Sequence, residues 1–233
     1  MTGRGPGPRV PPVSIIRRLL PVACLAAAYA LVVRPRLLRW GATDAEVRAP
    51  FPGADLIPDG ERSATMAVTI DAPPSRVWPW LVQMGLDRGG WYSWDHLDNW
   101  GRSSAHRIHP EWQGIALGDR LPSTPDRSQS WSVAALEPER FLGLRASLDL
   151  RGRQFDPAGP RPPHFTDSLW AFLLQELPDG RTRLVVSGYW AMRPLWLKRL
   201  TEVLVLEPSH WIMQTRQFSN LRRRAEREPG GEA

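Results

Sequence analysis

The sequence predicts an α+β fold in which a bent antiparallel sheet wraps around one long C-terminal helix. Three observations support this prediction. An alternating strand pattern opens the folded part near residue 65 and is followed by helical segments. Two pairs of strands come next, and the second pair is joined by a hairpin turn. Residues 194–228 are mostly helical, and one covering helix completes a sheet of this kind.

The first strand and helix are predicted by a change of hydrophobic period. In "TMAVTIDAP", which begins at Thr65, side chains alternate as in a half-buried strand. In "PPSRVWPWLVQMG", which follows, large apolar residues recur at helical spacing. Pro74 suits the first turn of this helix and Gly85 suits its end, whereas Pro79 predicts a kink or a delayed start.

The next strands are predicted as two hairpins. "SWSVAALEPE" and "FLGLRASLDL" are separated by a turn at residues 137–140. "DSLWAFLLQEL" and "RTRLVVSGYWAM" are joined by Pro178, Asp179 and Gly180, a strong hairpin signal. A weaker strand, "GDRLPS", precedes both pairs, and the final helix is expected to be interrupted at Pro208.

The excess of positive over negative charge lies in the N-terminal segment. Residues 1–49 hold eight arginines and two acidic residues, which account for the whole net charge of +6. The remaining residues are neutral overall, so the folded part has no broad basic face for phosphate groups. We therefore expect no nucleic-acid partner. Basic residues around an apolar run indicate a membrane surface instead.

Residues 19–33, "LLPVACLAAAYALVV", form an uncharged apolar run with arginines on both sides. At 1.5 Å per residue the run is roughly 22 Å long, shorter than the ~30 Å hydrocarbon core of a bilayer. Ile15 and Ile16, with flanking arginines that reach toward the headgroups, extend it to a spanning length. We expect a single-pass membrane anchor at residues 13–34. Arginines at both ends leave open on which side the folded domain lies.

Two other interpretations of this run remain open. It has the length of a signal-peptide core, and "AYA" at residues 28–30 resembles a cleavage site, although cleavage there would leave a second apolar stub. It also has the composition of a buried helix in a soluble protein. With an anchor, the chain divides into a basic tail at 1–12, the anchor at 13–34, a linker at 35–62, a folded domain at 63–228 and a tail at 229–233.

Five segments of the folded part resemble one superfamily. They are "AVTIDAPPSRVWPWLVQMG", "RGGWYSWD", "HPEWQGIALGD", "GRTRLVVSG" and "LEPSHWIMQTRQ". Together they resemble the START-like, or SRPBCC, superfamily, and within it the bacterial polyketide cyclase/dehydrase and lipid-transport proteins, over residues 63–228. The resemblance implies a helix-grip fold with a deep, mostly apolar cavity between the sheet and the C-terminal helix. It implies lipids, sterols, polyketides or hormones as ligand classes, and some members are enzymes.

The stretch "GGWYSWDHLDNW", residues 89–100, concentrates aromatic and acid/base side chains. Gly89 and Gly90 allow a sharp turn, and Ser93 is expected to cap a short helix that runs to about Trp100. Three interpretations stay open. The rings fill the core, they line a ligand pocket, or the acidic residues and the histidine carry acid/base chemistry.

Aromatic side chains make up most of the expected ligand-binding set. The set is Trp91, Tyr92, Trp94, Trp131, Trp170, Tyr189 and His210. Asp95 and His210 are weak candidates for catalysis. His96, His106 and His109 do not have the spacing of a zinc motif, so we expect neither a metal ion nor a cofactor.

The predicted function is binding of a small hydrophobic or amphipathic ligand, lipid- or polyketide-like, in an internal cavity of a membrane-tethered domain. An enzyme of the cyclase or dehydratase type is the alternative. It requires at least two of Asp95, Tyr92, His210 and Arg145 to converge on one point of the cavity. A scaffold whose twelve tryptophans fill the core is the third possibility. The sequence indicates no particular protein partner or oligomeric state.

Overall fold

The computed structural model describes residues 20–21, 24–25 and 27–227 of the chain. The chain divides into two compact units, of which the first ends at Leu37 and the second begins at Leu38. The second unit holds the sheet and the C-terminal helix. The linker expected at 35–62 therefore lies mostly within this unit.

The first unit contains the π-helical segment η1 (Tyr29–Val33) and most of helix α2 (Arg34–Leu38). Among the described residues, no helix combines the length and the apolar character that crossing a bilayer requires. The anchor expected at 13–34 lies partly outside the described residues, and the tails expected at 1–12 and 229–233 lie wholly outside them.

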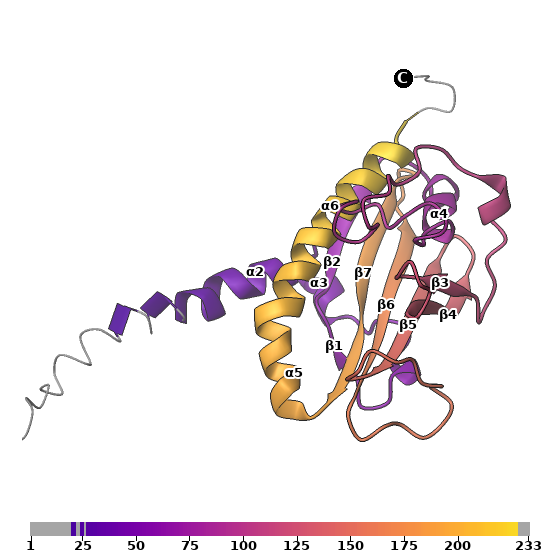
Figure 1. Ribbon diagram of the computed structural model, residues 1–233. Helices are drawn as coiled ribbons and strands as arrows, with labels where there is room; N and C mark the ends of the chain where they lie inside the picture. The colour runs from indigo at the N-terminus through magenta and orange to yellow at the C-terminus, as the bar shows by residue number, and fades with distance from the viewer. Residues whose placement is uncertain (1–19, 22–23, 26, 228–233) are drawn as a thin grey trace, which may run out of the picture. The chain divides into compact units, whose positions relative to one another are not determined.

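Seven antiparallel strands form one curved sheet (Figure 1). They are β1 (Glu61–Arg62), β2 (Met66–Ile70), β3 (Arg120–Pro122), β4 (Ser130–Glu137), β5 (Phe141–Asp149), β6 (Phe165–Glu176) and β7 (Thr182–Arg193). Their order is β1-β7-β6-β5-β4-β3, and β2 also pairs with β7. Between β6 and β7 the pairing is continuous, ending at Glu176 opposite Thr182, which confirms the hairpin predicted at Pro178, Asp179 and Gly180.

Helical segments surround this sheet. They are α3 (Asp44–Arg48), η2 (Ala54–Leu56), α4 (Pro74–Val82), η3 (Pro110–Trp112), α5 (Leu195–Thr201), η4 (Glu202–Leu206) and α6 (Glu207–Ala225). The last three follow one another as one long helix that lies along one face of the sheet (Figure 1). The α+β fold with a curved antiparallel sheet and a long C-terminal helix is therefore confirmed.

The two internal prolines interrupt their helices less than the sequence predicts. Pro208 lies in the first turn of α6, directly after the π-helical η4, so the expected break is a local widening of a continuous helix. Pro79 lies inside α4, which starts at Pro74 as predicted and shows no delayed start. The delay does not occur because a single missing backbone donor removes only one hydrogen bond of that helix.

The sheet is packed on both faces. On the face toward the long helix, which we call the helix face, Leu142, Phe172 and Val186 form one core cluster with Phe218 of α6. The opposite, outer face carries a second cluster, composed of Ala67, Phe141, Phe165, Leu169, Ala171, Val185 and Ala191 with Phe51 and Ile57 from the preceding segment. Because side chains alternate along a strand, each residue of β4 to β7 belongs to one face or the other.

The segment before β1 is fixed on the folded unit by charge and by hydrogen bonds. The side chains of Thr43 and Glu46 form a capping box at the start of α3. Arg183 of β7 donates from Nε to Glu46 at 2.7 Å. Leu38 and Trp40 accept backbone hydrogen bonds from the residues around β2. The segment is thus part of the domain's surface rather than a free connection.

Candidate functional site

The C-terminal half of α6 covers a filled part of the helix face. Beneath it Phe172, Leu184 and Val186 are fully buried, and so are Phe218 and Leu221 of the helix. Apolar side chains from both layers therefore fill this part, which we call the closed half, as in an ordinary protein core.

Solvent reaches the helix face nearer to α5. Five side chains of β4, β5 and β6 that face the long helix are half-buried there: Trp131, Leu148, Thr166, Ser168 and Trp170. Trp170 lies under Gln214, to which its indole N–H donates at 3.3 Å, and Trp190 lies under Lys198, 5.5 Å from its ring centre to Nζ. Ser168 is paired with Trp190 across the strands and points to the same face of the sheet. We call this part of the interface the open half.

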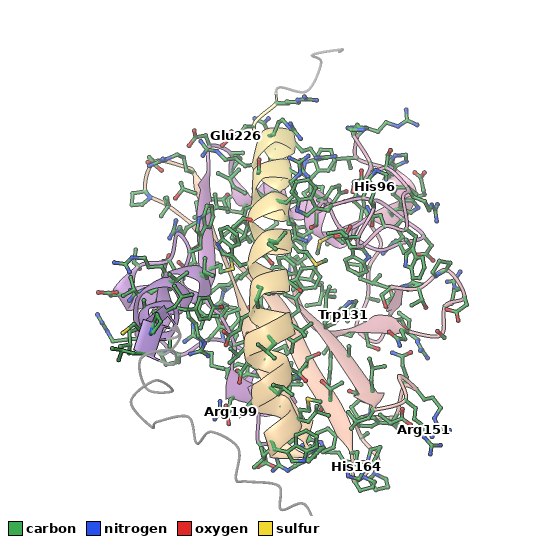
Figure 2. All side chains as sticks on the ribbon, turned by 60° about the vertical axis from the view of Figure 1, so that its left-hand side comes forward. His96, Trp131, Arg151, His164, Arg199 and Glu226 are labelled. Atoms are coloured by element: carbon green, nitrogen blue, oxygen red, sulfur yellow. The ribbon has the colours of Figure 1, made fainter. Side chains whose placement is uncertain are left out.

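A wall of aromatic rings separates the two halves. The ring centre of Trp170 is 4.8 Å from that of Phe172, 5.6 Å from that of Trp131 and 5.8 Å from that of Trp91. Trp91 is buried, whereas Trp131 and Trp170 are partly exposed. Figure 2 shows Trp131 beside the long helix. The wall offers flat apolar surface of the kind that holds hydrophobic ligands.

The long helix turns a line of polar residues toward the sheet. Glu207, His210, Gln214 and Gln217 recur at spacings of three and four, which places them on one helix face. Gln214 donates to Gln217 at 2.8 Å, and Gln217 donates to the carbonyl of Trp91 at 2.8 Å. These bonds satisfy the polar groups on the side of the closed half.

His210 lies one turn before Gln214 on this line, above the open half. Its Nε2 atom is buried and makes no hydrogen bond. Burial lowers the pKa of His210 to about 4, so the imidazole is neutral at pH 7. Buried polar atoms are nearly always hydrogen-bonded, so the orphaned Nε2 of His210 lacks a partner that a buried imidazole nitrogen ordinarily has.

The low pKa of His210 predicts a loss of stability on acidification. Between pH 6.5 and pH 4 the unfolded chain binds a proton on this residue and the folded chain does not, so the free energy of unfolding falls as the pH falls. The contribution is on the order of 2–3 kcal/mol. Urea unfolding at pH 7 and pH 4.5 measures it. In His210→Leu the difference between the two pH values is expected to shrink, and in His164→Leu, an exposed site, to stay unchanged.

Two residues of the 89–100 stretch belong to the core. Tyr92 is fully buried, and its hydroxyl accepts a hydrogen bond from Gln83 Nε2 at 2.6 Å. Its ring packs edge-on against Trp80 at 5.9 Å and lies 5.0 Å from the Arg224 guanidinium. Burial raises the pKa of Tyr92 to about 12. Tyr92 therefore lies outside the open half, whereas its neighbour Trp91 reaches the aromatic wall.

The short helix expected from Ser93 to Trp100 does not form. Asp95 Oδ1 instead accepts hydrogen bonds from Asn99 Nδ2 at 2.9 Å and from Ser104 Oγ at 2.7 Å. Residues 95–100 form turns and a bend, and Trp100 adopts a positive φ angle of 54°. The carboxylate of Asp95 thus holds a compact loop together.

Asp98, in the same loop, has no such partners. Neither of its buried carboxylate oxygens has a partner of normal hydrogen-bond geometry, and the nearby Ser93 hydroxyl and the backbone N–H groups of Asp98 and Asn99 offset burial only in part. Burial, reinforced by the charge of Asp95, raises the pKa of Asp98 to about 6.

The remaining predicted site residues lie elsewhere. Trp94 is on the surface, where its indole N–H donates to the Ile212 carbonyl at 3.3 Å. Tyr189 lies on the outer face of the sheet, and its hydroxyl donates to the Phe51 carbonyl at 2.7 Å. Arg145 lies on the outer face as well, paired with Asp167 at 2.7 Å. Of the predicted set, the structure brings together Trp91, Trp131 and Trp170, and it places His210 one turn along the helix from Gln214, which bonds to Trp170.

Sequence reasoning missed the polar residues of the open half. Ser168 and Thr166 alternate with outer-face residues along β6, and Gln214 follows His210 at i+4. The i, i+4 spacing was the available signal. This spacing does not by itself indicate a buried polar residue, because glutamine on a helix is ordinarily solvated.

No metal centre emerges from the part of the chain that the structure describes, where no three histidine, cysteine or acidic side chains gather. His109 Nδ1 lies 3.1 Å from Glu111, and its ring stacks on Trp112 at 4.1 Å. His96 and His106 are exposed.

A hollow, which we call the second hollow, lies at the C-terminal end of β6. It has a volume of about 610 Å³ and is lined by Pro50, Pro52, Pro74, Glu139, Arg140 and residues 173–176. Its walls are prolines, two leucines and polar or charged side chains, and it lacks the aromatic surface and the orphaned polar atom of the open half.

Comparison with known proteins finds structural resemblance but no family to which the chain can be assigned. No protein-family model matches the chain, and no curated protein sequence matches it. A crystal structure from Mesorhizobium loti is 18% identical, covers 69% of this chain and 95% of that chain, and has a TM-score of 0.38. A solution structure from Arthrobacter aurescens is 16% identical, covers 72% of this chain and 87% of that chain, and has a TM-score of 0.40. The crystal structure of CalU16 from Micromonospora echinospora is 15% identical, covers 73% of this chain and 88% of that chain, and has a TM-score of 0.33.

Proposed function

We propose that the chain binds a small hydrophobic or amphipathic molecule, lipid- or polyketide-like, in the open half between the long helix and the sheet. The observation that carries the proposal is the combination of partly exposed Trp131 and Trp170 with the buried, unpaired Nε2 of His210. The rings provide apolar contact, and the imidazole provides one polar contact that fixes orientation.

The neutral imidazole favours an uncharged polar group on the ligand. At pH 7 it either donates or accepts one hydrogen bond, depending on its tautomer, and it supplies no positive charge for an anion. A hydroxyl or carbonyl group at one end of an apolar body fits these two conditions. Gln214, one turn further along the same helix face, is already bonded to Trp170 and Gln217.

The enzymatic alternative has less support. It requires two acid/base groups at one point, and three of its four candidates are engaged elsewhere: Asp95 in its loop, Tyr92 in the core and Arg145 with Asp167. His210 remains alone, and a base with a pKa of about 4 abstracts protons poorly near neutrality. Binding without chemistry is therefore the proposal.

Two further parts of the proposal come from the sequence. The order of segments that resembles the START-like superfamily supports a helix-grip protein whose ligand space lies between sheet and helix. The uncharged run at 19–33 supports a single-pass tether at residues 13–34, which would hold the site close to a source of apolar ligands.

Photolabelling tests where the ligand binds. The full chain in maltoside detergent is irradiated with a diazirine analogue of a long-chain fatty alcohol, and labelled peptides are identified by mass spectrometry. Labels are expected on the peptides that contain Trp131, Trp170 and His210. Ser168→Phe fills the open half and is expected to reduce labelling there about tenfold, the ratio that a change of 1.4 kcal/mol in binding produces.

Gln175→Phe is the matched control, because Gln175 lies on the same strand, is exposed and lines the second hollow. It is expected to leave the labelling unchanged. Labels on residues 173–176 that disappear in Gln175→Phe and persist in Ser168→Phe would move the site to the second hollow and contradict the proposal.

A further inference from the structure

The long helix has its apolar and charged sides reversed over α5 and η4. Trp196, Leu200 and Leu204 recur at i, i+4 and i+8 and are 69%, 51% and 66% exposed. Lys198, on the inward side, is only 2% exposed. On a helix at a protein surface, apolar side chains ordinarily face inward and charged side chains face water, because burying a charge and exposing leucine both cost free energy.

The positive charge of Lys198 on the inward side is paired, so the reversed arrangement of α5 is a feature of the fold. Lys198 Nζ lies 3.0 Å from Glu61 of β1 and stands over the ring of Trp190 at 5.5 Å. These contacts fix the rotation of α5 about its axis. The apolar stripe is thereby held outward, together with neighbouring exposed residues of the same helix: Leu195, Val205 and Leu206.

Positively charged side chains flank this stripe. Arg199 follows Lys198, is two-thirds exposed, and also bridges to Glu61 and Glu202. Arg151 is exposed in the loop after β5. Figure 2 places Arg151 and Arg199 at the end of the molecule at which α5 begins, on either side of the helix. A stripe of tryptophan and leucine with arginines at its edges has the chemistry of a helix that lies in a lipid interface.

We propose that the stripe formed by Trp196, Leu200 and Leu204 docks on a lipid bilayer that contains anionic lipids. The leucines enter the boundary between headgroups and acyl chains, Trp196 lies at headgroup level, and the two arginines contact phosphates. The docking surface stands on its own side chains and does not depend on the ligand site.

Depth-dependent fluorescence quenching tests the docking. In a Cys24→Ser background, the full chain carries a nitrobenzoxadiazole label at Leu200→Cys or at His96→Cys, an exposed position at another part of the surface. The protein is reconstituted into vesicles of phosphatidylcholine and phosphatidylglycerol in a ratio of about 3:1, with or without doxyl-labelled acyl chains, a composition chosen to supply anionic headgroups. The label at 200 is expected to be quenched by the doxyl groups, and the label at 96 is not.

Charge substitutions identify the stripe as the cause. With the label at Leu204→Cys, Leu200→Glu is expected to abolish the quenching, whereas Leu97→Glu, at an exposed leucine outside the stripe, leaves it in place. Equal quenching at positions 96 and 200 would overturn the proposal. A label at 200 that is shielded from aqueous iodide without doxyl quenching would overturn it too, since another copy of the chain would then cover the stripe.

Discussion

Replacement of Asp167 by alanine is expected to lower the free energy of unfolding by about 3 kcal/mol. Asp167 is fully buried on the outer face of β6, where it accepts hydrogen bonds from two nitrogens of Arg145 at 2.9 and 2.7 Å. Arg161 and Ser147 donate to the same carboxylate at 2.7 and 2.9 Å. Without it, two largely desolvated guanidinium groups lose their counter-charge, which costs more than the pair contributes when intact.

Urea denaturation at pH 7 measures this effect, with Glu137→Ala as the control. Glu137 pairs with Arg140 at 2.8 Å, but both side chains are more than half exposed. Such surface pairs contribute less than about 1 kcal/mol. Equal losses of stability in the two variants would show that Asp167 and its arginine partners do not form a buried charge network.

Replacement of Trp170 by alanine is expected to destabilise the protein by about 3 kcal/mol and to abolish ligand photolabelling in the open half. Trp170 contacts three other aromatic rings and donates to Gln214, so its removal leaves a hole at the boundary between the closed and open halves. The stability loss comes from vanished ring contacts, and the binding loss comes from the missing apolar wall.

Trp196→Ala is the matched control for this prediction. Trp196 is 69% exposed on α5, so its truncation is expected to change stability by less than about 0.5 kcal/mol and to leave photolabelling intact. Thermal unfolding monitored by circular dichroism compares the two variants. A Trp170 variant as stable as the Trp196 variant would contradict the packing role of the aromatic wall.

The fold was largely predictable because its signals are local. The alternation that begins at Thr65 matches β2, and the helix predicted to begin at Pro74 does begin there. The turn at Pro178, Asp179 and Gly180 fixes the register of the two longest strands. Each of these signals lies within a few residues of the structure that it specifies, and the tertiary fold agrees with them.

The loop at 91–100 was wrongly predicted because its structure depends on contacts that a short window does not contain. Ser93 has the composition of a helix cap, yet its hydroxyl bonds to Met213 of α6. The neighbouring Asp95 accepts hydrogen bonds from Ser104, which lies beyond the predicted helix. Tertiary partners of this kind override local propensity.

The candidate site was predictable only in part, because the sequence does not say which face of the sheet a given side chain occupies. Tyr189 and Trp190 are adjacent on β7, so only one of them can face the long helix, and two aromatic residues in sequence do not say which. Pairing with β6 places Trp190 on the helix face and Tyr189 on the outer face. His210 was identified correctly as a residue of interest, but its lack of a partner is visible only in three dimensions.

Native mass spectrometry of the full chain, released from detergent micelles, tests most directly whether the open half holds a guest. The account predicts that the wild-type protein carries the mass of one additional small molecule, that Gln175→Phe retains it, and that Ser168→Phe loses it. A wild-type chain of bare mass, or an adduct equally abundant on Ser168→Phe, would contradict the claim that the space beside Trp131, Trp170 and His210 is a binding site.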